Sequence, residues 1–256
     1  MTQIRPFTLA IPDAQLDDLN LRLDLARWPE KECVGDWSQG TPLEVLQDLT
    51  GYWRGGYDWR RCEAKLNALG QFQTEIQGLD IHFLHVRSPR ADAVPLVMTH
   101  GWPGSVIEFM GVIEALANPP AGELAFHVVA PSLPGFGFSG KPTEAGWGVP
   151  KIAMAWAELM QRLGYSRWVA QGGDWGSAVT TAIGVIKPEG CLGIHLNMPI
   201  GRPEPEDLVA PSPAELKALA ALKHYQDWDS GYSTQQRTRP QSVGYGLVDS
   251  PVGLAG

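Results

Sequence analysis

The first third of the chain repeats apolar side chains at helical spacing. Leu16, Leu19 and Leu23 share one face of a helix predicted to begin near Asp13 and to end before Pro29. The same spacing predicts two more helices, over residues 42–53 and 58–69. Four of the ten tryptophans lie in this part, at positions 28, 37, 53 and 59. We therefore expect residues 1–72 to form an N-terminal helical segment that packs on a larger core.

From Phe72 the period changes to that of strands. Residues 73–86 alternate and turn near Gly78, which predicts a β-hairpin. Four short apolar runs then alternate with three spans of helical spacing: runs at 96–99, 126–131, 168–171 and 192–197, and helices at 106–116, 149–163 and 177–186. Alternating strands and helices need crossover connections. The pattern predicts an α/β fold with a mostly parallel sheet flanked by helices over residues 73–198.

Beyond Met198 the strand pattern stops. Ser212 and Glu215 form a capping box that opens a helix, and a polar stretch follows over residues 229–239. Ser250 and Pro251 predict the start of another helix. The sequence ends at Gly256, about one turn later, and one turn is too short for a stable helix. We expect residues 199–256 to begin a helical lid. We also expect the chain to be cut short, with the C-terminal part of the core missing and a sheet edge uncovered.

Composition narrows the classes of function. The length of 256 residues, 44% hydrophobic, suits one sizeable core, and the net charge of −8 disfavours nucleic acid or an anionic membrane as partner. Cys33, Cys62 and Cys191 fit neither a disulfide framework nor a zinc site. No signal peptide, long apolar run, phosphate loop or metal-ligand spacing is visible. The expectation is a cytoplasmic protein without a cofactor.

The candidate chemistry begins at residues 172–177, Gly-Gly-Asp-Trp-Gly-Ser, directly after an apolar run. Small residues around one side chain at a strand-to-helix junction form a nucleophile elbow. The raised side chain is Asp174, and a carboxylate suits displacement at a saturated electrophilic carbon, as in an epoxide or an alkyl halide. Aspartate before a helix is also a favoured N-cap, so this stretch taken alone is more often a structural turn.

A second motif favours the functional interpretation. His-Gly-Trp-Pro-Gly-Ser, residues 100–105, follows another apolar run where such folds supply an oxyanion-hole amide. Both motifs are predicted at the carboxyl ends of parallel strands, where ligands bind. His100 lies between small and rigid residues and is expected to shape the turn, not to act as a base. His195 and His224, in a predicted strand and helix, lack the setting of a catalytic histidine.

The ordered motifs resemble the microsomal-type epoxide hydrolases of the α/β-hydrolase superfamily. The matching stretches cover nearly the whole chain: RWP at 27–29, GYDWR at 56–60, IHFLH at 81–85, HGWPGS at 100–105, PSLPGFGFS at 131–139, GGDWGS at 172–177, and TRPQS through GYGLVDSPVGLA at 238–255. The resemblance implies that Asp174 opens the epoxide ring and forms an alkyl ester on the enzyme. It also implies that the backbone N–H groups of Trp102 and Trp175 form the oxyanion hole for hydrolysis of that ester.

The resemblance further assigns the remaining site residues. Tyr232 would donate a hydrogen bond to the epoxide oxygen, although the residues alone do not distinguish it from Tyr225 or Tyr245. Phe136 and Trp228 would line an apolar substrate pocket. The implied partner is a small apolar epoxide, with no nucleic acid, membrane or cofactor; the oligomeric state is not legible from the sequence.

This chain differs from the family in one respect that affects the reaction. The family's late acid, its catalytic histidine and a second lid tyrosine would all lie beyond Gly256. We therefore expect this chain to open the ring without turning over, or to be inactive. Two alternatives stay open: a haloalkane dehalogenase, which uses the same aspartate elbow, and a non-catalytic, truncated hydrolase-like fragment.

Overall fold

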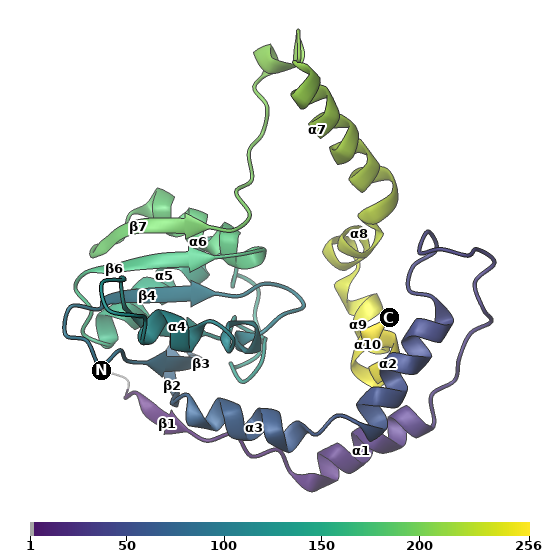
Figure 1. The fold of residues 1–256 in the computed structure, drawn as a ribbon, viewed down its shortest axis with the longest axis horizontal. Helices are drawn as coiled ribbons and strands as arrows, with labels where there is room; N and C mark the ends of the chain where they lie inside the picture. Colours follow the sequence, from purple (N-terminus) through teal and green to yellow (C-terminus); the bar gives the residue numbers. More distant parts are fainter. Residues whose placement is uncertain (1–2) are drawn as a thin grey trace. The chain divides into compact units, whose positions relative to one another are not determined.

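The computed structural model describes residues 3–256, which divide into two compact units. The first unit comprises the residues up to Ala10 together with Arg60–Ile200, and the second comprises Ile11–Trp59 and Gly201–Gly256. Both units are drawn in Figure 1, and each is described here by itself. The first 72 residues thus contribute to both units.

The first unit is built on one mixed sheet. The parallel part joins β5, β4, β6 and β7, and the antiparallel part adds β3, β2 and β1 beyond β5. The strands, in chain order, are β1 (Arg5–Phe7), β2 (Gln71–Ile76), β3 (Leu79–Val86), β4 (Val94–Thr99), β5 (Phe126–Pro131), β6 (Trp168–Gly172) and β7 (Cys191–Leu196). The α/β prediction is confirmed. The sheet contains more antiparallel pairs than expected, because the hairpin strands β2 and β3 belong to it and β1 pairs with β2.

The hairpin forms where alternation predicted it. Phe72 pairs with Phe83 across the two strands, and the turn residues Gln77 and Gly78 have φ of 51° and 80°. Two successive positive φ values match the twist of a two-residue hairpin. The three residues of β1 were not predicted as a strand, since three residues are too few to show a period.

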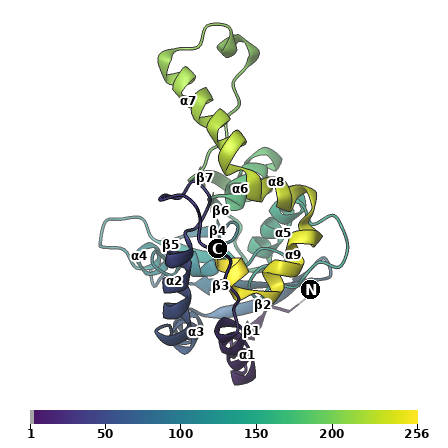
Figure 2. The same ribbon diagram turned by 90° about the vertical axis from the view of Figure 1, so that its right-hand side faces the viewer.

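Helices cover the two faces of the sheet unequally. In Figure 1 and Figure 2, α5 (Val149–Arg162) and α6 (Trp175–Ile186) lie on one face, and the short α4 (Ile113–Ala117) lies on the other. The prediction of one helix over residues 106–116 is wrong. The chain forms a 3₁₀ turn, η1 (Val106–Phe109), and then α4, with the poor helix former Gly111 between them.

The core lies between the sheet and the pair α5 and α6. Trp156, Leu159 and Ile183 are fully buried there, and the indole Nε1 of Trp156 donates to Thr99 Oγ1 at 3.1 Å. Each large apolar side chain buried in this way contributes about 1.5–3 kcal/mol. This packing holds the carboxyl end of β4, where Thr99 lies, against the helices.

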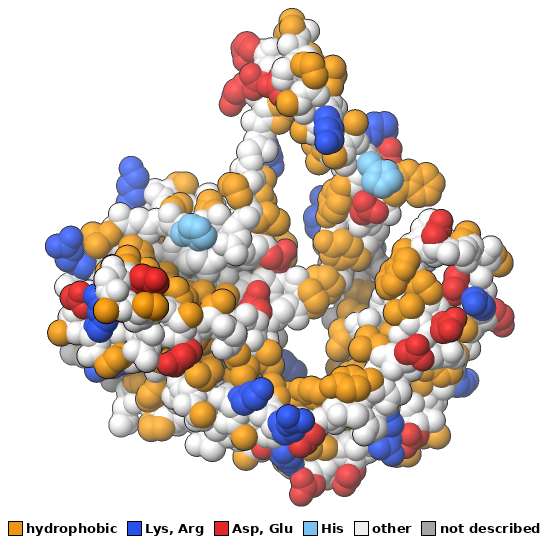
Figure 3. Space-filling view, viewed as in Figure 1, with side chains coloured by type: hydrophobic (Ala, Val, Ile, Leu, Met, Phe, Trp, Pro, Cys, Tyr) orange, Lys and Arg blue, Asp and Glu red, His pale blue; other side chains and the backbone are white. Residues whose placement is uncertain are grey.

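The other face of the sheet is partly open. A pocket of about 730 Å³ has apolar walls that include Leu96, Met98, Phe109 and Ile194, and polar groups that include Glu108, Gln171, His195 and Asn197. Strand β7 lies at the edge of the sheet, and the side chains of Leu192 and Ile194 on it are exposed. Figure 3 shows further apolar side chains on the surface.

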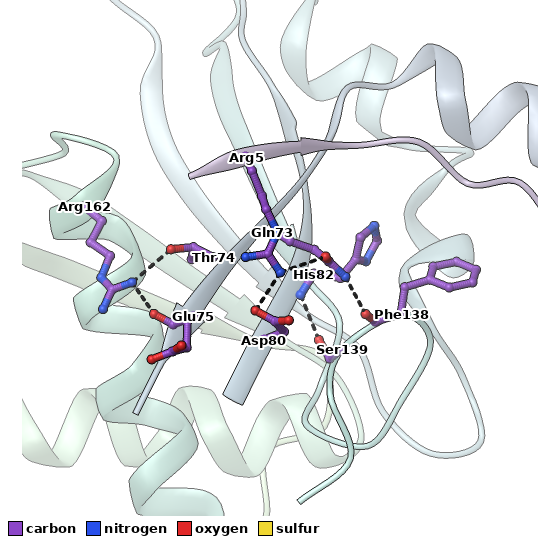
Figure 4. A network of polar contacts seen from close by, with 9 residues as sticks. All are labelled: Arg5, Gln73, Thr74, Glu75, Asp80, His82, Phe138, Ser139 and Arg162. Carbon is purple, nitrogen blue, oxygen red and sulfur yellow. Dashed lines mark hydrogen bonds and ion pairs between the residues drawn. The ribbon is translucent and has the colours of Figure 1, made fainter. Parts of the chain in front are cut away.

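Polar side chains tie the antiparallel edge to its neighbours, as Figure 4 shows. Arg5 on β1 forms an ion pair with Asp80 at 2.7 Å and donates to Gln73 Oε1 at 3.3 Å. Arg162 of α5 donates to Thr74 Oγ1 at 2.9 Å and to the carbonyl of Glu75. Arg5 therefore ties β1 to β2 and β3, and Arg162 ties β2 to α5, the helix that covers the core.

His82 is a fully buried member of the same region. Its ring nitrogens lie 2.9 Å from Ser132 Oγ and 2.9 Å from Gln71 Oε1, and its backbone N–H donates to Ser139 Oγ at 3.0 Å. Burial lowers the pKa of His82 to about 4 from its ordinary 6.5. The folded protein thus holds this ring neutral.

This buried histidine makes stability dependent on pH. Below about pH 6.5 the unfolded chain binds a proton that the folded chain refuses, so stability falls as the pH drops toward 4. For His82 the loss approaches about 3 kcal/mol. Burial lowers the pKa of His85 to about 4 as well, which acts in the same direction. Urea unfolding between pH 7.5 and 4.5 measures the slope. His82→Gln should reduce it, and an unchanged slope in that variant would contradict the assignment.

The second unit joins residues 11–59 to the C-terminal residues 201–256. Arg22 donates to the carboxylate of Asp249 at 2.8 Å, and Thr41 Oγ1 donates to the carbonyl of Gly256 at 3.0 Å. The capping box of Ser212 is confirmed. Helices α8 and α9 were not predicted, because polar and glycine-containing stretches show no clear apolar period. The helices are α1 (Asp13–Asp24), α2 (Leu43–Gly55), η2 (Pro205–Leu208), α7 (Pro213–His224), the π-turn η3 (Tyr225–Asp229), α8 (Gly231–Thr238), α9 (Pro240–Asp249) and α10 (Pro251–Ala255), with α3 (Trp59–Ala68) at the boundary with the first unit.

Candidate active site

Asp174 occupies a sharp turn between β6 and α6. Its backbone has φ of 50° and ψ of −126°, a conformation that costs free energy for any residue with a side chain. The residue stands at the N-cap position, but its side chain makes no capping hydrogen bond. Instead, Asp174 Oδ1 accepts from the backbone N–H of Trp102 at 2.7 Å. The carboxylate therefore points across to another loop, which the cap interpretation does not explain.

Glycines allow the turn to pack this closely. A Cβ atom on Gly176 would lie 1.9 Å from the carbonyl oxygen of Thr99, and one on Gly172 would lie 2.0 Å from the carbonyl oxygen of Gly176. Real side chains do not tolerate such distances, so the start of α6 reaches β4 and β6 only because these positions lack a side chain. The small residues that identified the elbow in the sequence are those that its packing requires.

The facing loop carries the amide that reaches Asp174. A Cβ atom on Gly101 would lie 2.2 Å from Asp174 Oδ1, so the two residues are in direct contact. His100 is buried. Its Nδ1 lies 3.0 Å from the carbonyl oxygen of Gly101, and its Nε2 accepts from Leu133 N–H at 3.0 Å. Burial lowers the pKa of His100, so the ring stays neutral. The two ring nitrogens thus connect the backbone of this loop to that of the loop that contains Leu133.

Trp175 is the first residue of α6. The N–H groups of a first helical turn have no partner within the helix and point beyond its N-terminus. The positive end of the helix dipole therefore lies beside Asp174. The indole of Trp175 is exposed, at 56%.

Glu108 is a site residue that the sequence did not reveal. Its Oε1 accepts from the N–H of Gly101 at 3.4 Å, on the loop that carries Trp102. Burial raises the pKa of the Glu108 carboxyl, the Gly101 amide opposes the rise, and the negative charge of Asp174 adds to it. A glutamate seven residues beyond Gly101 carried no recognisable signal, since it follows none of the spacings that mark paired carboxylates.

The end of β7 supports the elbow from another side. Asn197 N–H donates to the carbonyl of Gly172 at 3.1 Å, and its Oδ1 accepts from Gln171 Nε2 at 3.1 Å. Ser177 Oγ donates to the carbonyl of Met198 at 2.6 Å. These contacts hold Asn197 and Met198 against the turn that carries Asp174. No sequence pattern indicated them.

The other predicted site residues fall into two groups. Phe136 lies in the first unit, where its ring meets that of His100 edge-on with centroids 5.6 Å apart. Trp228 and Tyr232 lie in the second unit, 75% and 51% exposed, whereas Asp174 lies in the first unit. Tyr232 is in helix α8.

The two downstream histidines differ in their surroundings. His195 lines the open pocket on the sheet face. His224 ends α7 in the second unit, 3.7 Å from the carboxylate of Asp229. Among residues 3–256, no histidine is hydrogen-bonded to the Asp174 carboxylate, which accepts from Trp102 N–H.

Residues 3–256 contain no group of three or more histidine, cysteine, aspartate or glutamate side chains arranged to hold a metal ion. Within the same residues, no helix combines the length and apolar character needed to cross a bilayer.

Comparisons with known proteins agree with this architecture. The family model for the epoxide hydrolase N terminus matches residues 4–109, and that for the alpha/beta hydrolase fold matches residues 94–248. A "Putative epoxide hydrolase" of Stigmatella aurantiaca is 56% identical, and juvenile hormone epoxide hydrolase 2 of Ctenocephalides felis is 37% identical. The alignments cover 98% and 99% of this chain. The chain spans 58% of the length of each relative.

A solved structure shows the same likeness in three dimensions. The epoxide hydrolase of Aspergillus niger superposes with a TM-score of 0.89 at 37% identity, over 98% of this chain and 67% of that one. A likeness of this extent, together with the two family models, covers the sheet, the elbow and the helical segments. The chain therefore belongs to the epoxide hydrolase family of the α/β-hydrolase superfamily.

Proposed function

We propose that the Asp174 carboxylate opens an epoxide ring and forms an ester on the protein. Asp174 Oδ2 attacks a ring carbon, the bond from that carbon to the ring oxygen breaks, and the ring oxygen takes up a proton. The product is a hydroxyalkyl ester of Asp174. Carboxylate nucleophiles divide a difficult displacement into two easier steps in this way.

The observation that carries this proposal is the hydrogen bond from Trp102 N–H to Asp174 Oδ1 at 2.7 Å. It leaves Oδ2 to attack, and it prepares the second step. When water attacks the ester carbon Cγ, the negative charge develops on the carboxyl oxygen, where the Trp102 amide already donates. Loss of one such donor typically costs about 2.7–4 kcal/mol. The N–H of Trp175 is the second proposed donor.

Tyr232 is the proposed acid for the ring oxygen. A phenol that donates a hydrogen bond stabilises the alkoxide as it leaves, which general acid catalysis requires. Phe136 and Trp228 are the proposed apolar walls for an aryl or alkyl epoxide. These assignments rest on the family resemblance, whereas that of Asp174 rests also on its contacts.

The second step is expected to be slow in this chain. Hydrolysis of the ester needs a base that takes a proton from water. Both ring nitrogens of His100 are engaged by backbone groups, and within residues 3–256 no histidine is hydrogen-bonded to Asp174. The ester is therefore expected to accumulate.

Intact mass spectrometry tests the proposal. Incubation with excess aryl epoxide should add one epoxide mass, and peptide mapping should place it on Asp174. Epoxides also alkylate thiols, and Cys33 is exposed, so hydroxylamine is the control: it cleaves an ester and spares a thioether. A mass that stays after hydroxylamine, or steady diol production without an adduct, would sink the proposal. An alkyl chloride that labels Asp174 and releases chloride faster than the epoxide reacts would favour the dehalogenase alternative.

A further inference from the structure

The Glu108 side chain lies against the loop that faces Asp174. Two successive amides of this loop donate to two carboxylates: Gly101 N–H to Glu108 Oε1 at 3.4 Å, and Trp102 N–H to Asp174 Oδ1 at 2.7 Å. A Cβ atom on Gly104 would lie 2.7 Å from Glu108 Oε1. The loop is therefore held between the two acidic side chains, with a glycine where each approaches.

Local structure fixes the place of Glu108. Ser105 caps η1, its Oγ accepting from Ile107 N–H at 3.3 Å, and Glu108 N–H donates to the Ser105 carbonyl at 3.1 Å. Val106 and Phe109 are buried and anchor this turn on the sheet. Although the Glu108 side chain is otherwise exposed, its backbone has little freedom, so its carboxylate is presented to the loop.

The position of the Glu108 carboxylate near the Asp174 carboxylate is electrostatically unfavourable. Like charges that share one loop repel each other. Among residues 3–256, no ion pair is formed by Glu108 that would neutralise it. The amide of Gly101 is the hydrogen-bond donor that the structure places at its oxygen. The negative charge of Glu108 near that of Asp174 is explained if the role of Glu108 is to accept the hydrogen bond from Gly101 N–H.

We propose that Glu108 is a positioning residue: by accepting the Gly101 N–H it orients the Gly101–Trp102 peptide so that the Trp102 N–H stays on Asp174. The inference rests on the proposed role of Asp174 in the chemistry. It concerns both steps, because the Trp102 amide orients the attacking carboxylate and then receives the developing negative charge.

Three variants separate the hydrogen bond from the charge. Glu108→Gln keeps an acceptor at the same reach and removes the charge, Glu108→Asp keeps the charge but falls short of Gly101, and Glu108→Ala removes both. Glu114→Ala is the matched control, since Glu114 is exposed on α4 and its carboxylate accepts from Asn118 Nδ2 at 3.4 Å. Two quantities are measured on the full chain: the rate of ester formation with excess aryl epoxide, and deuterium uptake of the peptide that contains Gly101 and Trp102.

The expected result is that Glu108→Ala and Glu108→Asp slow ester formation about tenfold or more and raise deuterium uptake. Glu108→Gln should stay within about threefold of the unchanged protein, and Glu114→Ala should match it. Rates in Glu108→Ala equal to those of the unchanged protein would overturn the inference, as would a loss in Glu108→Gln as large as that in Glu108→Ala. If Glu108→Ala does not fold, the comparison of Glu108→Gln with Glu108→Asp tests the inference, because both variants keep a polar side chain.

The two measurements distinguish failure of the proposed function of Asp174 from failure of the positioning role of Glu108. If the unchanged protein forms no ester at Asp174, the proposed function fails, and deuterium uptake still tests the positioning role. Greater uptake in Glu108→Ala and Glu108→Asp than in Glu108→Gln supports that role. Equal uptake in all variants and the unchanged protein rejects it.

Discussion

Replacing Asp174 with asparagine is expected to abolish ester formation with an epoxide, by a factor of at least about 10³. The amide has nearly the shape of the carboxylate, and asparagine tolerates the positive φ of 50° at this turn better than most residues. The fold and the elbow should therefore persist, while the nucleophilic oxygen is lost. Intact-mass measurement of the adduct over time gives the rate for both proteins.

The control for this variant is Asp92→Asn. Asp92 is an exposed aspartate of the first unit that forms an ion pair with Arg90 at 2.7 Å, away from the elbow. Its loss is expected to leave both the labelling rate and the stability essentially unchanged, because exposed ion pairs contribute little. Adduct formation in Asp174→Asn at the rate of the unchanged protein would show that another residue is alkylated, and the nucleophile assignment would be wrong.

Replacing Gly101 with alanine is expected to have the next largest effect. The added methyl group would lie 2.2 Å from Oδ1, 2.4 Å from Cβ and 2.6 Å from Cγ of Asp174. Either the carboxylate or the loop must move, and the hydrogen bond from Trp102 N–H cannot survive at its present length. Misplacing a reacting group by about 1 Å slows a reaction about 10²-fold, so labelling should slow by about that factor, and overpacking costs about 1–3 kcal/mol of stability.

Gly111→Ala is the matched control for the glycine variant. Gly111 lies ten residues further along the same segment, and a Cβ atom there would meet nothing within 4 Å. This variant should label as fast as the unchanged protein and lose no stability in urea. A Gly101→Ala protein that labels at the unchanged rate would show that contact between the loop and Asp174 does not matter for the reaction.

Much of the first unit could be predicted because its elements carry their own periodic signals. Strand β5 lies at the residues that its apolar run predicted, and α5 differs from the prediction by one residue. The hairpin followed from alternation and from the glycine at its turn. Elements without such a signal were missed: β1 is a strand only because β2 offers it an edge to pair with. The break at Gly111 was missed because helical spacing continues across it.

Some residues of the candidate site could also be recognised from a local motif, and others could not. The glycines at positions 172 and 176 made the elbow recognisable, because close packing of a helix on a strand end demands small residues. Whether Asp174 acts as a helix cap or faces another loop depends on contacts between residues 72 positions apart. Glu108 and Asn197 reach the site through folding of separate segments, and neither belongs to a local motif.

By itself the sequence determined the α/β architecture, the elbow and the family resemblance, because periodicity, turn chemistry and motif order are local properties. Only the tertiary structure decided where the Asp174 carboxylate points, that the Trp102 amide meets it, and that a second carboxylate, Glu108, holds the same loop. The physical reason is that hydrogen bonds between distant segments depend on how strands and helices pack. That packing depends on the shape of the whole core, which a local pattern does not contain.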